Sequence, residues 1–302
     1  MKLATLHDGS RHGQLAVISP DLSQAHYASG IAATLQQALD DWNFIAPQLQ
    51  TLYEALARGQ ARHAFAFDPA RCLAPLPCTA QLAFATGEPP ASFPAPALPV
   101  MELAAGDTLR GPAQPWQTVP GQAADFEPQL AALCAAAPRA ATPEQGQDAI
   151  RLLTLACALR LRKVEESAES APALADSRPA TIFAPVAITP DELGPRWQGG
   201  QPALTLQVQL NGRKTALLDA ARAWPLGHAV AASARVRALA PGAVLAAGVP
   251  PANSGHASLA ARRASGLPAP WLQSGDTLLI QARSAGGPGA GDWFGPLQIE
   301  LG

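Results

Sequence analysis

The run Leu204-Thr205-Leu206-Gln207-Val208-Gln209-Leu210 decides the fold class of this chain. Apolar and polar side chains alternate along it without a break. This pattern is typical of a β-strand with one buried face, because successive side chains of a strand point to opposite sides. Asn211-Gly212 follows directly, and this pair favours a two-residue hairpin turn since both residues tolerate positive φ. The sequence therefore predicts a strand that turns back into a hairpin.

Short apolar runs on both sides of this hairpin indicate further strands. We expect these strands near residues 181–183, 186–188, 243–245, 277–280 and 297–301. A single helix, at about residues 225–239, is expected among them. Many strands with few helices predict a β-rich α+β domain and not a doubly wound parallel sheet.

The N-terminal part carries a different pattern. Residues 3–6 and 14–18 predict a second hairpin, and Thr34 is a typical N-cap for a helix over residues 35–57. Pro47 predicts a kink in that helix or two abutting helices. A proline-punctuated connector begins at Phe67. We place the domain boundary there, with a small domain over residues 1–72 and a larger one over residues 73–302.

Two stretches of the larger domain have patterns that differ from the strands. Residues 88–120 are rich in proline and are expected to form a long loop. Thr142-Pro143-Glu144-Gln145 is a helix-start signal, and helical character is expected to continue through the leucines at 152, 153 and 155. A loop is expected at residues 165–176.

Composition limits the classes of function. The 302-residue chain has 21 Lys and Arg against 23 Asp and Glu, so no excess charge favours nucleic acid or an anionic membrane as a partner. Asp8 falls where a signal peptide needs apolar residues, and no apolar run reaches the ~20 residues that span a bilayer. The four cysteines lack CxxC spacing and suggest buried or spare thiols. We expect a soluble, cytoplasmic protein.

Several segments, in order along the chain, resemble the fumarylacetoacetate hydrolase family. They lie at residues 2–6, 21–27, 39–43, 74–77, 177–181, 185–194, 275–280 and 294–295. The resemblance implies a β-roll catalytic-type domain behind a small N-terminal α+β domain. It also implies a dimer, and a Mg²⁺, Mn²⁺ or Ca²⁺ ion that holds a small oxo-acid. Cleavage of a carbon–carbon bond beside a ketone needs such a metal and a base that activates water.

The residues that match the family's metal site are mostly replaced. The resemblance places a Glu-x-Glu pair at Glu127 and Gln129, so the second carboxylate is a neutral amide here. The third carboxylate, an aspartate in the family, corresponds to Ala158, which follows Cys157. Hard divalent cations prefer charged oxygen ligands. We therefore expect no metal cofactor, or Mg²⁺ or Mn²⁺ if the degenerate site at Glu127 and Gln129 survives.

Other family positions are also altered. Residues 78–100 hold neither the His nor the Arg of the family, and Glu102 stands where the family has a tyrosine. Arg178 replaces the catalytic lysine, which keeps the charge but changes the geometry. The substrate loop keeps Asn253 as a candidate substrate-binding residue. His256, just beyond it, is a candidate replacement base.

Each candidate also has an ordinary structural interpretation. Glu127 is better explained as a solvated carboxylate at a strand end, and Arg178 as a surface arginine. Cys157 is expected to be a small buried side chain. The charged residues at 160–166 are expected to form a solvated helix end, and the glycine-rich residues 286–291 a flexible hairpin that lacks the context of a phosphate loop.

Three hypotheses of function remain. The leading one is a catalytically inactive or strongly altered family member that acts as a binding or scaffold subunit, as a homodimer or with an intact relative. The second is a divalent-metal-dependent hydrolase, decarboxylase or isomerase that acts on a C–C bond of a small oxo-acid. The third is a metal-free enzyme that uses Arg178 and His256. None of them has a nucleic-acid or membrane partner.

Overall fold

The predicted hairpin forms one side of an antiparallel sheet. The computed structural model describes residues 1–302 apart from 91–96, 108, 168–175, 253–255 and 285–291. In it β14 (Leu204–Leu210) pairs with β15 (Arg213–Asp219), and Asn211 and Gly212 both have positive φ at the turn. With β17 (Thr277–Ser284) and β18 (Leu297–Glu300) they form a four-stranded sheet in the order β15-β14-β17-β18.

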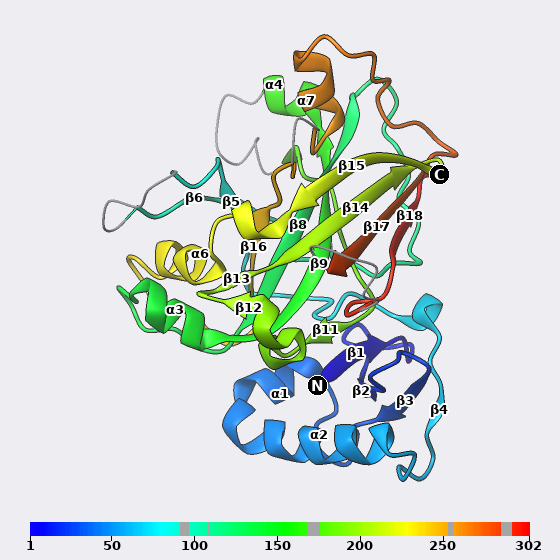
Figure 1. The fold of residues 1–302 in the computed structure, drawn as a ribbon, viewed down its shortest axis with the longest axis vertical. Helices are drawn as coiled ribbons and strands as arrows, with labels where there is room; N and C mark the ends of the chain where they lie inside the picture. Colours follow the sequence, from blue (N-terminus) through cyan, green and yellow to red (C-terminus); the bar gives the residue numbers. More distant parts are fainter. Residues whose placement is uncertain (91–96, 108, 168–175, 253–255, 285–291) are drawn as a thin grey trace.

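A larger mixed sheet lies behind it (Figure 1). In the described residues it contains twelve strands, ten of them in one path and two, β7 (Leu109–Arg110) and β10 (Thr181–Phe183), beside it. The path runs in the order β4 (Phe65–Ala66), β3 (Gln24–Tyr27), β2 (Gln14–Ile18), β1 (Lys2–Leu6), β11 (Ala187–Ile188), β9 (Ile150–Leu161), β8 (Ala124–Cys134), β16 (Ala243–Gly248), β5 (Leu82–Thr86) and β6 (Val100–Ala104).

The small N-terminal unit joins this sheet directly. β1 and β2 form the predicted hairpin, and β1 also pairs with β11. The helical stretch is two abutting helices, α1 (Leu35–Asp40) and α2 (Trp42–Ala57), and Thr34 caps the first. The break lies at Asp41, whereas Pro47 is accommodated inside α2. Because both units share one sheet, the boundary between residues 72 and 73 stays a prediction.

The predicted β-rich α+β class is confirmed, but several elements differ from the prediction. The leucine-rich residues after α3 (Pro143–Ala149) belong to β9 and not to a helix. Both faces of β9 are buried, so its apolar run has no alternation that would reveal a strand. The expected loop at 88–120 contains β6 and β7, and β6 forms a hairpin with β5. The helix expected at 225–239 is shorter, α6 (Leu226–Ser233).

Short helices complete the described part of the chain. They are α4 (Arg162–Glu166), α7 (Leu259–Ala264) and the 3₁₀ turns η1 (Pro69–Arg71), η2 (Pro190–Arg196) and η3 (Ala220–Arg222), with a two-stranded ribbon of β12 (Trp197–Gln198) and β13 (Gln201–Pro202). Helix α7 is a second helix among the C-terminal strands, where only one was expected. No helix in this part of the chain is long and apolar enough to cross a bilayer.

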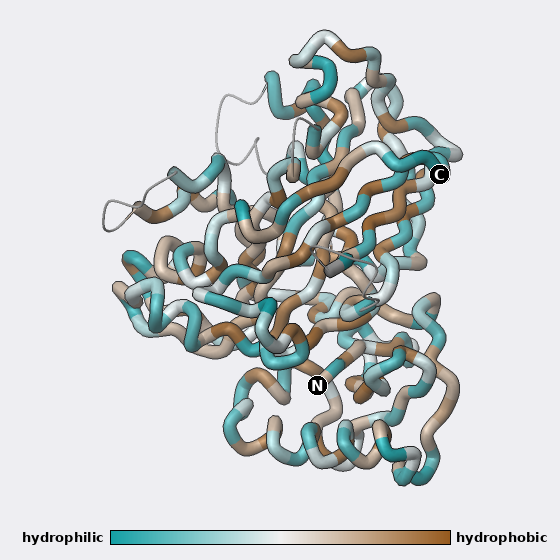
Figure 2. Tube along the Cα trace, viewed as in Figure 1, coloured by the Kyte–Doolittle hydropathy of each residue, from teal (hydrophilic) through white to brown (hydrophobic). Residues whose placement is uncertain are grey.

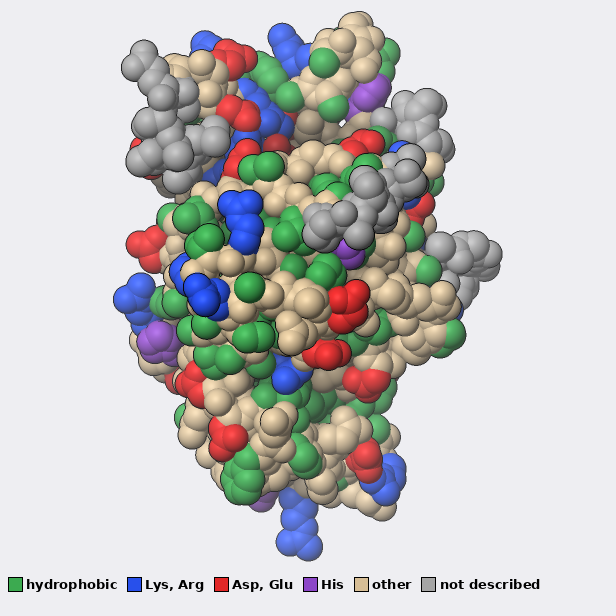
Figure 3. Space-filling view, turned by 90° about the vertical axis from the view of Figure 1, so that its left-hand side faces the viewer, with side chains coloured by type: hydrophobic (Ala, Val, Ile, Leu, Met, Phe, Trp, Pro, Cys, Tyr) green, Lys and Arg blue, Asp and Glu red, His purple; other side chains and the backbone are tan. Residues whose placement is uncertain are grey.

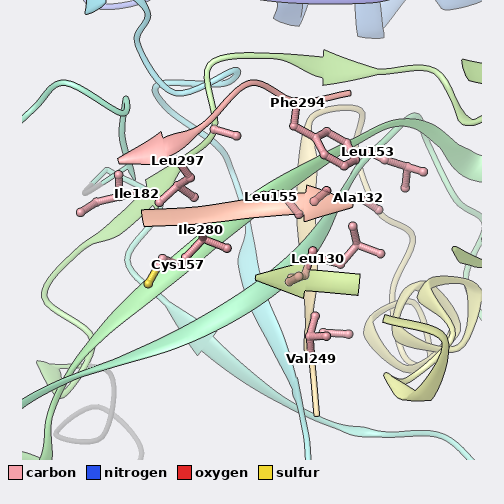
Figure 4. Close-up of a cluster of buried hydrophobic side chains, with 14 of the residues drawn as sticks. Leu130, Ala132, Leu153, Leu155, Cys157, Ile182, Val249, Ile280, Phe294 and Leu297 are labelled. Carbon is pink, nitrogen blue, oxygen red and sulfur yellow. The ribbon is translucent and has the colours of Figure 1, made fainter. Parts of the chain in front are cut away.

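The core lies between the two sheets. One face of β8 and β9 packs against the four-stranded sheet, and Figure 4 shows these side chains meeting. The labelled side chains include Leu130, Leu155 and Cys157 from β8 and β9, and Ile280 and Leu297 from β17 and β18. Figure 2 shows hydrophobic residues concentrated along these strands. Cys157 is fully buried, as predicted. On the opposite face, Leu133 and Leu152 pack in a second apolar cluster with α1 and α2, and the polar side chains stand at the other end of the two strands.

Helices α3 and α6 approach each other through glycines. A Cβ atom added to Gly146 of α3 would lie 2.3 Å from the carbonyl oxygen of Gly227 in α6. A Cβ atom on Gly227 would lie 2.4 Å from the carbonyl oxygen of Pro143. Both distances are shorter than van der Waals contact, so the two backbones can meet here only because neither residue has a side chain.

Candidate active site

The register of β8 and β9 sets the positions of the charged residues. Across this ladder Asp125 faces Arg160 and Glu127 faces Ala158. Because side chains of a strand alternate between faces, residues 125, 127 and 129 of β8 share one face with residues 156, 158 and 160 of β9. This face points away from the core of Figure 4. Carboxylates and a guanidinium therefore stand side by side on one surface of the sheet.

A cleft of about 480 Å³ opens over this surface. It contains four of the five site residues predicted from the sequence, namely Glu127, Gln129, Arg178 and His256. The fifth, Asn253, lies outside the described residues. Figure 3 shows basic and acidic side chains gathered in a hollow at the upper end of the molecule, the end that carries α4 and α7 in Figure 1.

Asp125 holds one wall of the cleft in place. Its carboxylate is fully buried and accepts hydrogen bonds from the backbone N–H groups of Leu259 and Ala260, at 2.8 and 3.0 Å. Arg162 donates to Oδ2 of the same carboxylate, from Nε at 2.9 Å and from Nη2 at 2.8 Å. A two-pronged guanidinium–carboxylate contact of this kind is geometrically specific. Asp125 thus ties the start of α7 to β8 and to Arg162.

Glu127 is surrounded by three guanidinium groups. Its Oε1 atom lies 3.5 Å from Nε of Arg160 and 3.1 Å from Nη2 of Arg162, and its Oε2 atom lies 3.8 Å from Nη2 of Arg178. The side chain is 24% exposed. The interpretation of Glu127 as a solvated strand-end carboxylate is therefore wrong. It is an ion-paired group in the floor of the cleft.

Arg178 is also buried and not a surface arginine. Only 5% of it is exposed, and its guanidinium carbon lies 4.8 Å from the centre of the Phe84 ring. This stacking is a favourable cation–π arrangement that also holds the guanidinium plane in place. Glu102 forms ion pairs with Nη1 of Arg178 and, at 3.8 Å, with Nη1 of Arg160. The ring of Phe84 and the carboxylate of Glu102 thus hold Arg178 in place.

The pKa values follow from this network. Burial lowers the pKa of Arg178, and the neighbouring charge of Arg160 lowers it further. Burial opposes the charge of Arg162 as well, but the carboxylates of Asp125 and Glu127 raise the pKa of Arg162 above its ordinary value. Burial alone would raise the pKa of Glu165, yet its hydrogen bond from Arg162 and the charge of Arg160 lower it.

These residues do not fit a hard divalent cation. In the described part of the chain no three His, Cys, Asp or Glu side chains are grouped so that they could hold an ion. Ala158, which faces Glu127, offers no ligand atom. A cation beside Glu127 would also meet the positive charges of Arg160, Arg162 and Arg178. Charge count controls affinity at oxygen-ligand sites, so this arrangement disfavours Mg²⁺ or Mn²⁺.

Sequence reasoning missed the arginines of β9 and α4. Residues 160–166 were expected to be a solvated helix end, but Arg160 is only 3% exposed and the Arg162 side chain 13% exposed. The helix exists as α4, although Arg160 precedes it in β9. Alternate residues of a strand share a face, so Arg160 could have been placed on the same face as Ala158. This inference requires that the preceding apolar run is recognised as a strand.

Comparison with known proteins agrees with the fold. Residues 1–78 match the family model described as Fumarylacetoacetase N-terminal domain 2, and residues 76–297 match Fumarylacetoacetate (FAA) hydrolase C-terminal. No curated protein sequence matches the chain. Among solved structures, a maleylpyruvate hydrolase from Sphingobium sp. SYK-6 in complex with manganese(II) ion and pyruvate is 16% identical, with a TM-score of 0.71 over 100% of this chain and 98% of that one.

Two further structures are similar. The fumarylacetoacetate hydrolase from psychrophilic Exiguobacterium antarcticum is 16% identical, with a TM-score of 0.70 over 100% of this chain and 99% of that one. The 2-hydroxyhepta-2,4-diene-1,7-dioate isomerase from Mycobacterium marinum is 18% identical, with a TM-score of 0.57 over 76% and 77%. Together the two family models match residues 1–297 of the 302-residue chain. The chain therefore belongs to the fumarylacetoacetate hydrolase family.

Proposed function

We propose that this protein binds a small oxo-acid through its carboxylate at Arg160 and Arg178, and that it does so without a divalent cation. On this proposal it is an altered family member that acts as a binding subunit and does not catalyse metal-dependent cleavage of a C–C bond. The observation that carries the proposal is the pair of buried arginines in the floor of the cleft, beside Gln129 and Ala158, the positions where a metal-binding relative would need carboxylates.

The chemistry of the two arginines supports an anionic ligand. A guanidinium presents N–H groups in a planar fork that matches a carboxylate. Among the described residues, no hydrogen-bond partner is found for the Nε atoms of Arg160 and Arg178. Their burial removes competition from water, which strengthens an electrostatic contact with a ligand.

Gln129 supports a ligand with a second polar group. It is 3% exposed and lines the cleft, and its Oε1 atom has no hydrogen-bond partner in the described part of the chain. A buried amide without a partner costs free energy, so a ligand that supplies one gains affinity. His256 lines the same cleft and offers a further polar group to a ligand. A hydroxyl or enol group beside a carboxylate can donate to the Oε1 atom of Gln129, whereas a keto group can only accept from the Nε2 side of the amide.

The relatives support the class of ligand. The maleylpyruvate hydrolase structure contains pyruvate, a small oxo-acid. Among the described residues no three His, Cys, Asp or Glu side chains are grouped so that they could hold a manganese(II) ion such as that structure contains, so in this proposal the arginines attract the anion. We include association with a second copy, or with an intact relative, in the proposal. Its support is that β15 is an edge strand of the described four-stranded sheet, whose outer side is paired with residues 250–252 only near Leu218.

The experiment is calorimetric titration with pyruvate and with 2-oxoglutarate in the presence of EDTA. We expect saturable binding that Arg178→Met weakens at least about tenfold, because the carboxylate loses a charged partner. Methyl pyruvate, which lacks the carboxylate, is the matched control and should not bind. Binding that requires added Mn²⁺, or turnover of an acylpyruvate with Mn²⁺, would contradict the proposal and favour the metal-dependent hydrolase.

A further inference from the structure

We infer that Glu102 competes with the ligand. Its carboxylate already forms the ion pairs with Arg178 and Arg160 that the carboxylate of the ligand must form. This inference rests on the proposed function and deepens it. It makes Glu102 the residue that sets the affinity of the cleft for carboxylates.

The contacts of Glu102 are those of a bound carboxylate. Its Oε2 atom is buried and forms ion pairs with Nη1 of Arg178 and with Nη1 of Arg160. Both arginines are at least nine-tenths buried and line the cleft together with Glu102. A carboxylate between two buried guanidinium groups is the arrangement that an anionic ligand would adopt, so the two cannot be present at once.

The two sides of this contact differ in how firmly they are held. Arg178 is stacked on Phe84, a contact that does not involve Glu102. Glu102 belongs to β6, the edge strand of the large sheet, and its side chain is 26% exposed. An exposed rotamer is therefore open to Glu102 at low cost, because its carboxylate is rehydrated when it leaves the arginines. The exchange needs only a side-chain rotation.

The charges of the cleft give this exchange a selective role. Four carboxylates, those of Asp125, Glu102, Glu127 and Glu165, pair with the three guanidinium groups of Arg160, Arg162 and Arg178. A ligand carboxylate added to the intact network would bring a further, unpaired negative charge into a buried site. When it displaces Glu102 outward, the number of carboxylates in the floor stays the same. A neutral ligand does not drive this rotation, so the cleft favours acids over their esters and amides.

The test compares wild type with Glu102→Gln, which keeps the shape of the side chain and removes its charge. Calorimetric titration with pyruvate in EDTA should show a Kd about tenfold lower for Glu102→Gln. In this variant no free energy is needed to remove the Glu102 carboxylate from the two arginines before the ligand binds. Glu88→Gln is the matched control. Glu88 is exposed at the edge of the same cleft, so loss of its screened charge should change the Kd by less than about twofold.

Each outcome has a defined meaning. An unchanged or higher Kd in Glu102→Gln overturns the inference and leaves the proposed function intact, provided that wild type binds pyruvate. Binding by Glu102→Gln alone supports both. If neither protein binds pyruvate, the proposed function fails and the inference fails with it. Thermal unfolding checks that Glu102→Gln is folded. If it is not folded, Glu102→Ala, which also removes the carboxylate, is titrated in its place.

Discussion

The Nε atom of Arg160 lies 3.5 Å from Oε1 of Glu127. The two side chains come from neighbouring strands, and Arg160 is two residues beyond Ala158, the direct cross-strand partner of Glu127. On this face of the sheet a ligand atom is missing at Ala158 and a positive charge stands at Arg160. The site therefore carries positive charge of its own beside the carboxylate that a metal would need.

We predict that the protein binds no divalent cation tightly. Glu127 is the one carboxylate that remains of the family's three, and its charge is neutralised by arginines. Calorimetric titration with Mg²⁺ and Mn²⁺ should show no binding in the micromolar range. Micromolar binding that Glu127→Ala abolishes would contradict this prediction.

Arg160→Met should destabilise the protein by about 2 to 4 kcal/mol, because it leaves Glu102, Glu127 and Glu165 short of a buried partner. Urea unfolding at neutral pH measures this change. Arg58→Met is the matched control, since Arg58 pairs with Glu54 on the surface of α2 and is 59% exposed. Its loss should cost less than about 1 kcal/mol. Equal effects at the two sites would show that the cleft network does not stabilise the fold.

Glu165 predicts a specific pH dependence of stability. Its pKa is lowered from the ordinary 4.5 in the folded protein, so its contribution to the free energy of unfolding is complete above that value and is lost as the pH falls through the folded pKa. Wild type should therefore exceed Glu165→Gln in stability at pH 6, and the difference should shrink below pH 4.5. Denaturant unfolding of both proteins across this range is the measurement. A difference that stays constant with pH would refute the assignment.

Gly146→Ala should destabilise the protein by about 1 to 3 kcal/mol, although alanine favours helix more than glycine does by about 1 kcal/mol. The added Cβ would press on the backbone oxygen of Gly227, which cannot move as a side chain can. Gly30→Ala is the control, because nothing lies within 4 Å of a Cβ there. It should change the free energy of unfolding by less than about 0.5 kcal/mol. If Gly146→Ala left the free energy of unfolding unchanged, α3 and α6 would be able to move apart without loss of stability.

The class of fold could be predicted from the sequence alone, but the candidate site could be predicted only in part, because Arg160 and Arg162 suggested a solvated helix end. The alternation in residues 204–210 and the turn at Asn211 and Gly212 predicted the hairpin that the structure has, since period-2 burial and positive φ are local properties. The resemblance to the family also predicted that Gln129 and Ala158 replace two carboxylates, and that tight metal binding is lost with them. Which other charges come close to Glu127 could not be predicted, because that depends on the packing of distant segments.

Only the tertiary structure decided those charges. Arg160, Arg178 and Glu102 come from separate segments of the chain. β9, which carries Arg160, pairs with β8, and the edge strand β6 of the same sheet brings Glu102 to both arginines. The sequence of β9 did not predict this arrangement. A strand buried on both faces shows no alternation, and the leucines of β9 suggested a helix. Ion pairs between distant strands depend on register, and register is set by burial of the whole sheet and not by any one segment.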